Sequence, residues 1–158
     1  MDFKNIVNIL KKQQKHIATM ESCTGGGIAN AITNIEGASE ILEFSAVTYS
    51  NEYKMKMGVP KEVIEKYTVY SQQTANEMSK CISNFASSDY GIGVTGKLNR
   101  IDPKNQVGED NVVFISIYNK EKKSYTEQKI TVNKTTRQQN KELIIEEVIK
   151  LLEKTIKE

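Results

Sequence analysis

The sequence has few of the residues on which several common kinds of active site depend. It contains one histidine, His16, and two cysteines, Cys23 and Cys81. His16 precedes the first expected strand, so a Ser-His-Asp triad would have to use it from the wrong end of that strand. The two cysteines lack the paired spacing of a zinc site. We therefore expect no histidine-based triad, no bound metal and no cofactor.

The sequence also lacks a large excess of either basic or acidic residues. The chain has 22 Lys and Arg against 20 Asp and Glu, a formal net charge of +2, whereas nucleic-acid binders typically have a strong basic excess. No stretch is long and apolar enough to span a membrane. No export signal is recognised before the first helix, so a disulfide is not expected. We expect a cytoplasmic homo-oligomer that binds neither nucleic acid nor membrane.

The spacing of apolar residues predicts alternating helices and strands. Helices are expected at 2–14, 25–34, 71–86 and 135–157, with short ones around Lys54 and from Pro60 onward; strands are expected at 17–20, 42–49, 90–94, 112–118 and 125–132. Ser71 is expected to cap its helix, and Phe85 to lie on the apolar face of that helix. This order predicts a single domain over residues 1–158, an α/β fold with a three-layer α/β/α sandwich around a mixed sheet of about five strands.

The most informative segment is Glu21-Ser22-Cys23-Thr24-Gly25-Gly26-Gly27, which follows a short apolar run and precedes a helical pattern of small residues. A turn at this place presents hydroxyls and free backbone N–H groups at the positive end of a helix. Such a turn can hold an anion, stabilise an oxyanion or present a nucleophilic serine. It is also compatible with an ordinary helix start, capped by a serine or threonine.

Two further strand ends carry polar residues. Ala46 to Lys54 ends an apolar run in Tyr49, hydroxyl groups and a lysine, and Val94-Thr95-Gly96 ends another strand. A lysine can act as a base for a serine if burial lowers its pKa, and a tyrosine can orient or relay the proton. Because open α/β sheets place ligands at the carboxyl ends of their strands, these segments are expected to share one pocket. In the alternative interpretation Tyr49 only packs and Lys54 is solvated.

These segments resemble the CinA C-terminal domain family, whose members include nicotinamide mononucleotide amidases. The resemblance rests on five blocks in order: Glu21 to Gly26, Ile28 to Ser39, Tyr49 to Val59, Tyr70 to Met78 and Val94 to Gly96. It implies the same α/β/α architecture and a nucleotide substrate. It also implies catalytic roles for Ser22 as nucleophile, Lys54 as base and Tyr49 as proton relay or orienter. The implied substrate-binding residues are Thr24, Gly25, Gly26, Thr95, Gly96 and Arg137.

The chain departs from the family pattern after Gly96. Family members continue with a Gly-Pro-Gly-Gly loop, whereas this chain has a charged loop from Lys97 to Asp110. Backbone N–H groups approach a ligand less closely there, so anion contacts are expected from the side chains of Lys97, Arg100 and Lys104. The family has a pair of arginines before its last helix. Arg137 matches one of them, whereas the position of the other falls near Asn133 or Lys134.

Several residues carry two interpretations. Cys23 could be the nucleophile or a buried structural thiol. Glu21 could orient the lysine or cap the turn, and Arg137 could bind a phosphate or lie on the surface. Asp102, Glu109 and Asp110 form a loose acidic loop.

The function expected from the resemblance is the hydrolysis of nicotinamide mononucleotide to nicotinate mononucleotide and ammonia. The alternatives are a non-catalytic nucleotide-binding or interaction module and an amidase for another substrate.

Overall fold

The computed structural model describes residues 1–158 and is built on a five-stranded sheet in the order β2-β1-β3-β4-β5. The strands are β1 (Ile17–Glu21), β2 (Leu42–Val47), β3 (Tyr90–Gly96), β4 (Val112–Asn119) and β5 (Ser124–Thr131). β1 pairs in parallel with β2 and β3, while β4 and β5 are antiparallel to their neighbours. The prediction of a mixed sheet is confirmed.

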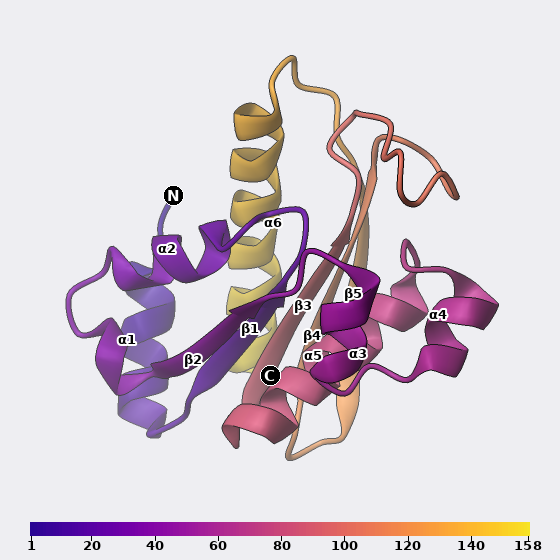
Figure 1. The fold of residues 1–158 in the computed structure, drawn as a ribbon. Coiled ribbons are helices and arrows are strands. Elements are labelled where there is room, and N and C mark those ends of the chain that lie inside the picture. The colour runs from indigo at the N-terminus through magenta and orange to yellow at the C-terminus, as the bar shows by residue number, and fades with distance from the viewer.

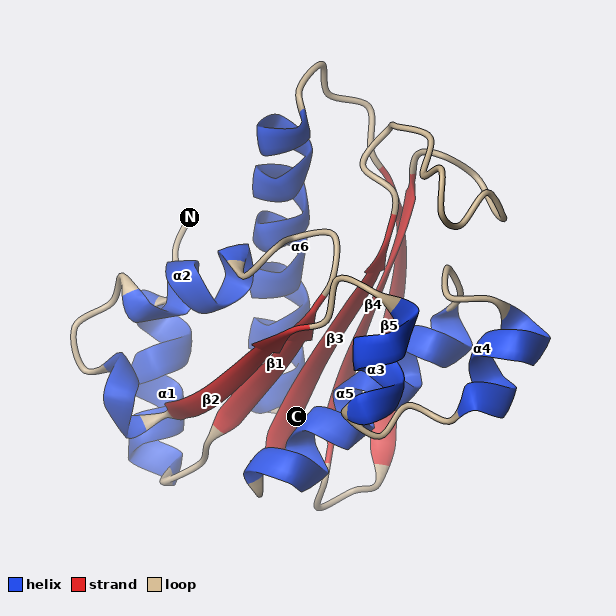
Figure 2. Ribbon diagram, viewed as in Figure 1, coloured by secondary structure: helices blue, strands red, loops and turns tan.

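Helices cover both faces of this sheet (Figures 1 and 2). On one face lie α1 (Lys4–Gln13), α2 (Gly27–Thr33) and α6 (Arg137–Lys157), and on the other lie α3 (Asn51–Lys56), α4 (Lys61–Tyr67) and α5 (Gln72–Ala86); a 3-10 turn, η1 (Ala38–Glu40), precedes β2. The chain therefore has the three-layer α/β/α fold expected from its sequence.

The central strands bury both of their faces. Along β1, Ile17 contributes to the apolar cluster shared with α1, α2 and α6, whereas Ala18 and Met20 contribute to a smaller one against α5. All residues of β1 and β3 are buried, as expected for strands covered by helices on both sides. The larger cluster also includes residues of β3, and these two strands carry the candidate site at their carboxyl ends.

Two glycines of β3 let α5 approach the sheet closely. A Cβ at Gly91 would lie 1.9 Å from the carbonyl oxygen of Ser79, and one at Gly93 would lie 2.4 Å from that of Ala75. Real Cβ atoms do not come so close to a backbone oxygen, so only glycine fits at both positions. Its absence of a side chain allows the helix backbone to lie directly on the strand.

The helix boundaries agree with the sequence interpretation except in details. Ser71 caps α5, and its side chain accepts a hydrogen bond from the N–H of Thr74 at 3.1 Å. Pro60 is the N-cap residue of α4 rather than its first helical residue.

The expectation that Phe85 lies on the buried face of α5 is wrong. It is 62% exposed, and its ring packs against that of Phe44 on edge strand β2, which is itself exposed.

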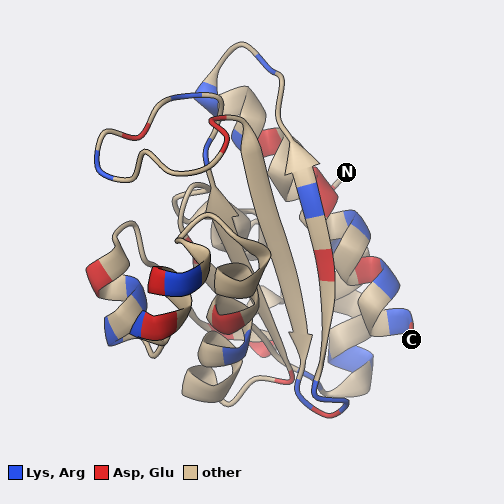
Figure 3. Ribbon diagram, turned by 90° about the vertical axis from the view of Figure 1, so that its right-hand side faces the viewer, with Lys and Arg blue, Asp and Glu red and all other residues tan.

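Charged residues of both signs are spread over the outer helices and the long loop at the upper left of Figure 3. None of the helices combines the length and apolar character needed to cross a bilayer.

The parallel strands β1, β2 and β3 all end at the same edge of the sheet. The chain runs from β1 to one neighbour and later returns to the other, and such switch points are where open α/β sheets bind ligands.

Candidate active site

Ser22 occupies the tight turn that joins β1 to α2. Its backbone N–H donates to the carbonyl of Val94 on β3 at 3.1 Å, which fixes the turn on the sheet. Gly25 and Gly26 have φ angles of +60° and +90°, a region that glycine enters without steric cost. The turn therefore holds Ser22 at the rim of the sheet, almost buried but open to a cavity.

Glu21 caps α2 from within the protein. Its buried carboxylate accepts hydrogen bonds from the Thr24 hydroxyl at 2.7 Å and from the backbone N–H groups of Ile28 and Ala29 at 2.8 and 2.9 Å. A carboxylate at a helix N-terminus satisfies unpaired donors and interacts favourably with the helix dipole. Of the two roles considered for Glu21, the structure shows the capping role. The N-terminus of α2 is therefore already occupied by a carboxylate of the protein itself.

Lys54 lies directly behind Ser22. Helix α3 begins after Ser50, whose hydroxyl accepts a hydrogen bond from the N–H of Tyr53, and its first turns carry Lys54 under the β1 turn. The Lys54 Nζ donates to the carbonyl of Thr48 at 2.8 Å and to the Ser22 Oγ at 3.2 Å. The side chain is buried, and its amine is thereby held against a single hydroxyl group.

Burial decides the protonation of this amine. It lowers the pKa of Lys54 from 10.5 to about 8, although the charge of the Asp102 carboxylate acts in the opposite direction. A lysine with this pKa is neutral in about a tenth of the molecules at pH 7. Lys54 can therefore accept a proton from Ser22 at physiological pH, which a solvated lysine does far less readily.

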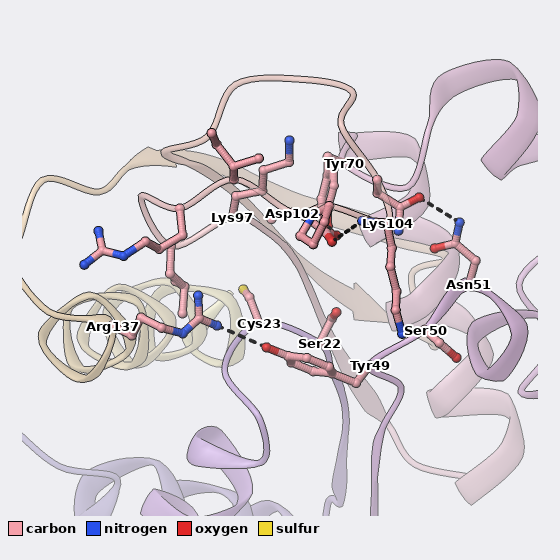
Figure 4. Close-up of a pocket in the computed structure, with 16 residues that line it drawn as sticks. Ser22, Cys23, Tyr49, Ser50, Asn51, Tyr70, Lys97, Asp102, Lys104 and Arg137 are labelled. Carbon is pink, nitrogen blue, oxygen red and sulfur yellow. Dashed lines mark hydrogen bonds between the residues drawn. The ribbon is translucent and has the colours of Figure 1, made fainter.

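Ser22 opens into a cavity of about 560 Å³, within the range of small-molecule sites, roughly 300–1,000 Å³. Tyr49 and Arg137 lie on one side of Ser22 in Figure 4, and Tyr70 and Asp102 lie on the other. The lining consists of Ser22, Cys23, Tyr49, Ser50, Asn51, Tyr70, Gly96, Lys97, Leu98, Arg100, Ile101, Asp102, Pro103, Lys104, Asn105 and Arg137. Three strand ends, the start of α6 and the loop after β3 thus enclose one space.

The loop from Lys97 to Asp110 forms one wall of this cavity. Leu98 anchors it in the core, and the Nδ2 of Asn51 donates to the Oδ1 of Asn105 at 3.1 Å. The Lys97 ammonium is buried, pairs with Asp110 at 3.2 Å and lies 5.0 Å from the centre of the Tyr70 ring. Lys97 therefore has a structural ion pair, unlike Arg100 and Lys104, which form no ion pair with an acidic side chain.

The structure brings several of the expected site residues together and separates others. Ser22, Tyr49, Gly96 and Arg137 line the cavity, and Lys54 reaches it through Ser22. Tyr49 contacts neither Ser22 nor Lys54 by hydrogen bond; its hydroxyl accepts from the Arg137 guanidinium at 3.0 Å. This contact draws Arg137 to the cavity rather than leaving it as an isolated surface residue.

The remaining expected residues act through the backbone or support the fold. Gly25 and Gly26 shape the turn without lining the cavity. The Thr24 hydroxyl bonds to Glu21, and the buried Thr95 hydroxyl donates to the carbonyl of Val69 at 2.9 Å. Both threonine side chains are therefore occupied inside the protein. The backbone N–H groups that stay without a protein acceptor in this turn are those of residues 23, 24 and 26.

Cys23 is unsuited to act as the nucleophile. Burial raises the pKa of its thiol to about 12, and a protonated thiol is a poor nucleophile. His16 lies at the opposite end of β1 from Ser22, next to Asp89. No group of three or more His, Cys, Asp or Glu side chains is placed to hold a metal ion. Of Ser22 and Cys23, the two candidates for the nucleophile, only Ser22 forms a hydrogen bond with Lys54.

Sequence reasoning did not single out Asn51, Tyr70 and Asn105, which are among the lining residues. Asn51 and Tyr70 adjoin the N-caps Ser50 and Ser71, a pattern that predicts a helix start but not the direction of a neighbouring side chain. Asn105 belongs to the loop that departs from the family pattern. Only the pairing of this loop with α3 and with the segment before α5 reveals that these residues face one cavity.

The fold and site define an α/β protein with a cavity of small-molecule size and a buried serine–lysine pair at the switch point of its sheet. The CinA C-terminal domain matches residues 3–156, and the chain belongs to this family. The resemblance noted in the sequence is confirmed.

Individual relatives agree with this assignment. A CinA-like protein of Kosmotoga olearia is 38% identical over 116 residues, which are 72% of this chain and 27% of that protein. The chain thus spans about a quarter of the length of this curated relative. The crystal structure of the competence/damage inducible protein CihA from Agrobacterium tumefaciens has a TM-score of 0.85 at 24% identity, covering 98% of this chain and 92% of that one. A CinA superfamily protein from Enterobacter cloacae also has a TM-score of 0.85, at 23% identity, covering 97% and 89%. At these identities the two structures show the fold alone.

Proposed function

We propose that the chain is a serine amidohydrolase that converts nicotinamide mononucleotide and water to nicotinate mononucleotide and ammonia. The observation that carries this proposal is the Lys54 Nζ, buried and 3.2 Å from the Ser22 Oγ, with its pKa lowered to about 8. A nucleophile within hydrogen-bond reach of a base whose pKa is near the working pH is the arrangement that acyl transfer requires.

The proposed reaction has two halves. Ser22 Oγ attacks the amide carbon while Lys54 takes the hydroxyl proton, and the tetrahedral intermediate collapses to an ester as ammonia leaves with the proton from Lys54. Water then attacks the ester, again giving a proton to Lys54, which returns it to Ser22 as the carboxylic acid leaves; the acid then loses its remaining proton to solvent and becomes the carboxylate product. The unpaired N–H of Cys23, next to the nucleophile, is the proposed donor to the oxyanion.

A phosphorylated substrate is supported by the charge of the cavity. Four basic side chains line it, from Lys97, Arg100, Lys104 and Arg137, against the single carboxylate of Asp102. Lys97 is balanced by Asp110, which leaves the other three available to an anion. Guanidinium and ammonium groups at a cavity rim attract phosphate strongly, and the arginines can bind it through two hydrogen bonds.

The decisive assay is incubation of the purified protein with nicotinamide mononucleotide, with ammonia and the acid product measured together. The proposal requires equal amounts of both and no release when Ser22 is replaced by alanine. Binding of the nucleotide without turnover would contradict the hydrolase and favour the non-catalytic nucleotide-binding module. Turnover of another amide, with none of the nucleotide, would assign a different substrate to the same machinery.

A further inference from the structure

Asp102 stands apart among the charged residues of the cavity. It is the one acidic side chain in the lining, and it comes from the loop in which this chain differs from its family pattern. No lysine or arginine forms an ion pair with it, because the buried Lys97 of the same wall pairs with Asp110 instead. The cavity therefore contains a carboxylate with which no lysine or arginine forms a direct ion pair.

The surroundings of Asp102 keep this carboxylate charged and in place. The Tyr70 hydroxyl donates to its Oδ2, and the backbone N–H of Lys104 donates to its Oδ1 at 2.9 Å. Partial burial raises the pKa of Asp102, but these hydrogen bonds outweigh it and leave the pKa below its ordinary value. Asp102 is consequently an anion at neutral pH, with both oxygens oriented by the protein.

Aromatic rings accompany the carboxylate. Tyr70 holds Asp102 on one side of Ser22, and the exposed ring of Tyr49 lies on the other side (Figure 4). Aromatic faces attract cations, and the Lys97 ammonium 5.0 Å from the Tyr70 ring is one instance. A flat ring whose amide reaches Ser22 would lie between these two walls, within the field of the carboxylate.

We infer that Asp102, held by Tyr70, is a specificity-determining residue that selects substrates whose amide-bearing ring is positively charged. The inference rests on the proposed function, since it concerns the ring end of the same substrate. In nicotinamide mononucleotide the ring nitrogen is quaternary and cationic, while the phosphate is anionic. An unpaired carboxylate at one wall and basic residues at the rim match that charge distribution.

The test compares two ligands of nearly the same shape, nicotinamide mononucleotide and its reduced 1,4-dihydro form, whose ring is neutral. Binding is measured by calorimetry in the Ser22→Ala protein, so that neither turnover nor the reactivity of the amide affects the result. We expect the oxidised ligand to bind at least about tenfold more tightly, because the attraction between ring and carboxylate is present only there. Adding Asp102→Asn, which retains an acceptor for Tyr70, should weaken binding of the oxidised ligand about tenfold and change the reduced one little.

Two control variants make the outcome specific. Glu109→Gln removes a charge from the same loop outside the main cavity, and it should leave the ratio of the two affinities unchanged. Asp102→Glu keeps the charge and should keep most of the selectivity. Thermal unfolding of each variant verifies that the loop change has not unfolded the protein.

The outcomes separate this inference from the proposed function. If Asp102→Asn weakens both ligands equally, or neither, the inference is wrong while nucleotide binding stands. If Ser22→Ala binds the reduced form as tightly as the oxidised one, the inference is also wrong. If neither ligand binds the Ser22→Ala protein, the proposed function fails, and the role of Asp102 fails with it.

Discussion

At the scale of single residues, the site depends on how little water reaches Lys54. On the surface of α3 its amine would be solvated, as is the amine of Lys56 in its exposed ion pair with Glu52. Inside the protein, the pKa falls to about 8, chiefly because burial penalises the charged form. Burial alone converts a common surface residue into a candidate base.

Replacement of Ser22 by alanine should abolish hydrolysis and leave the fold intact. Loss of the nucleophile of a catalytic unit typically lowers kcat about a thousandfold or more, and the alanine fits the space of the serine. Ammonia release under saturating substrate measures the effect. Cys23→Ala is the control, because its protonated thiol has no part in the proposed chemistry; it should keep activity of the same order. A Ser22→Ala protein with more than about a tenth of the original rate would exclude Ser22 as nucleophile.

The rate should follow the deprotonation of Lys54. Since the free amine is the proposed base, kcat/KM is expected to rise with pH up to about 8 and then level off. Lys54→Met should lower kcat about a hundredfold or more, and should remove this rise. Lys56→Met on the same helix should change neither. A profile of kcat/KM that is flat between pH 6 and pH 9 would contradict the assignment.

At the scale of elements, the loop from Lys97 to Asp110 is the least predictable part of the site. Its three basic residues were expected to act alike, yet the structure gives them different partners. Lys97 is buried against Asp110 and Tyr70, whereas Arg100 and Lys104 line the cavity with their charges unpaired. Under the proposed function, we therefore expect Arg100 and Lys104, rather than Lys97, to contact the phosphate of the substrate.

Replacing Arg100 and Lys104 together by alanine should raise KM about tenfold for the mononucleotide and little for the corresponding riboside. The difference arises because only the mononucleotide carries the anion that these side chains attract. The control removes the same charge from the far end of the sheet, by Lys120→Ala with Lys122→Ala in the β4–β5 turn. Initial rates at two salt concentrations add a check, since contacts made by exposed side chains weaken with salt. Equal changes for both substrates would show that the loop does not recognise the phosphate.

Local patterns in the sequence predicted most of the elements and only part of the site. Strand and helix positions follow from apolar spacing, and the Ser22 turn follows from its glycines. The role of Glu21 could not be decided in this way, because capping α2 and orienting Lys54 both need a carboxylate at that place. Tyr70 and Asn51 were missed since their contacts, to Asp102 and Asn105, join segments far apart in the chain.

At the scale of the whole molecule, the buried Lys54 links the site to stability. Below pH 8 the folded protein holds a charged amine away from water, a cost that the unfolded chain does not have. Between pH 8 and pH 10.5 the folded state has released this proton while the unfolded state still binds it. The unfolded state then binds more protons, so the free energy of unfolding rises with pH in this window.

This linkage can be measured as a difference between two proteins. Relative to Lys54→Met, the wild-type free energy of unfolding should increase by up to about 3 kcal/mol between pH 8 and pH 10.5, the equivalent of the shift in the Lys54 pKa. Urea unfolding of both proteins at several pH values provides the numbers, and groups that titrate equally in the two cancel. The matched variant Lys56→Met, on the exposed face of α3, should show no such pH-dependent difference from wild type. A constant difference between wild type and Lys54→Met across this range would mean that Lys54 titrates normally in the folded protein, and it would remove the physical basis for its role as a base.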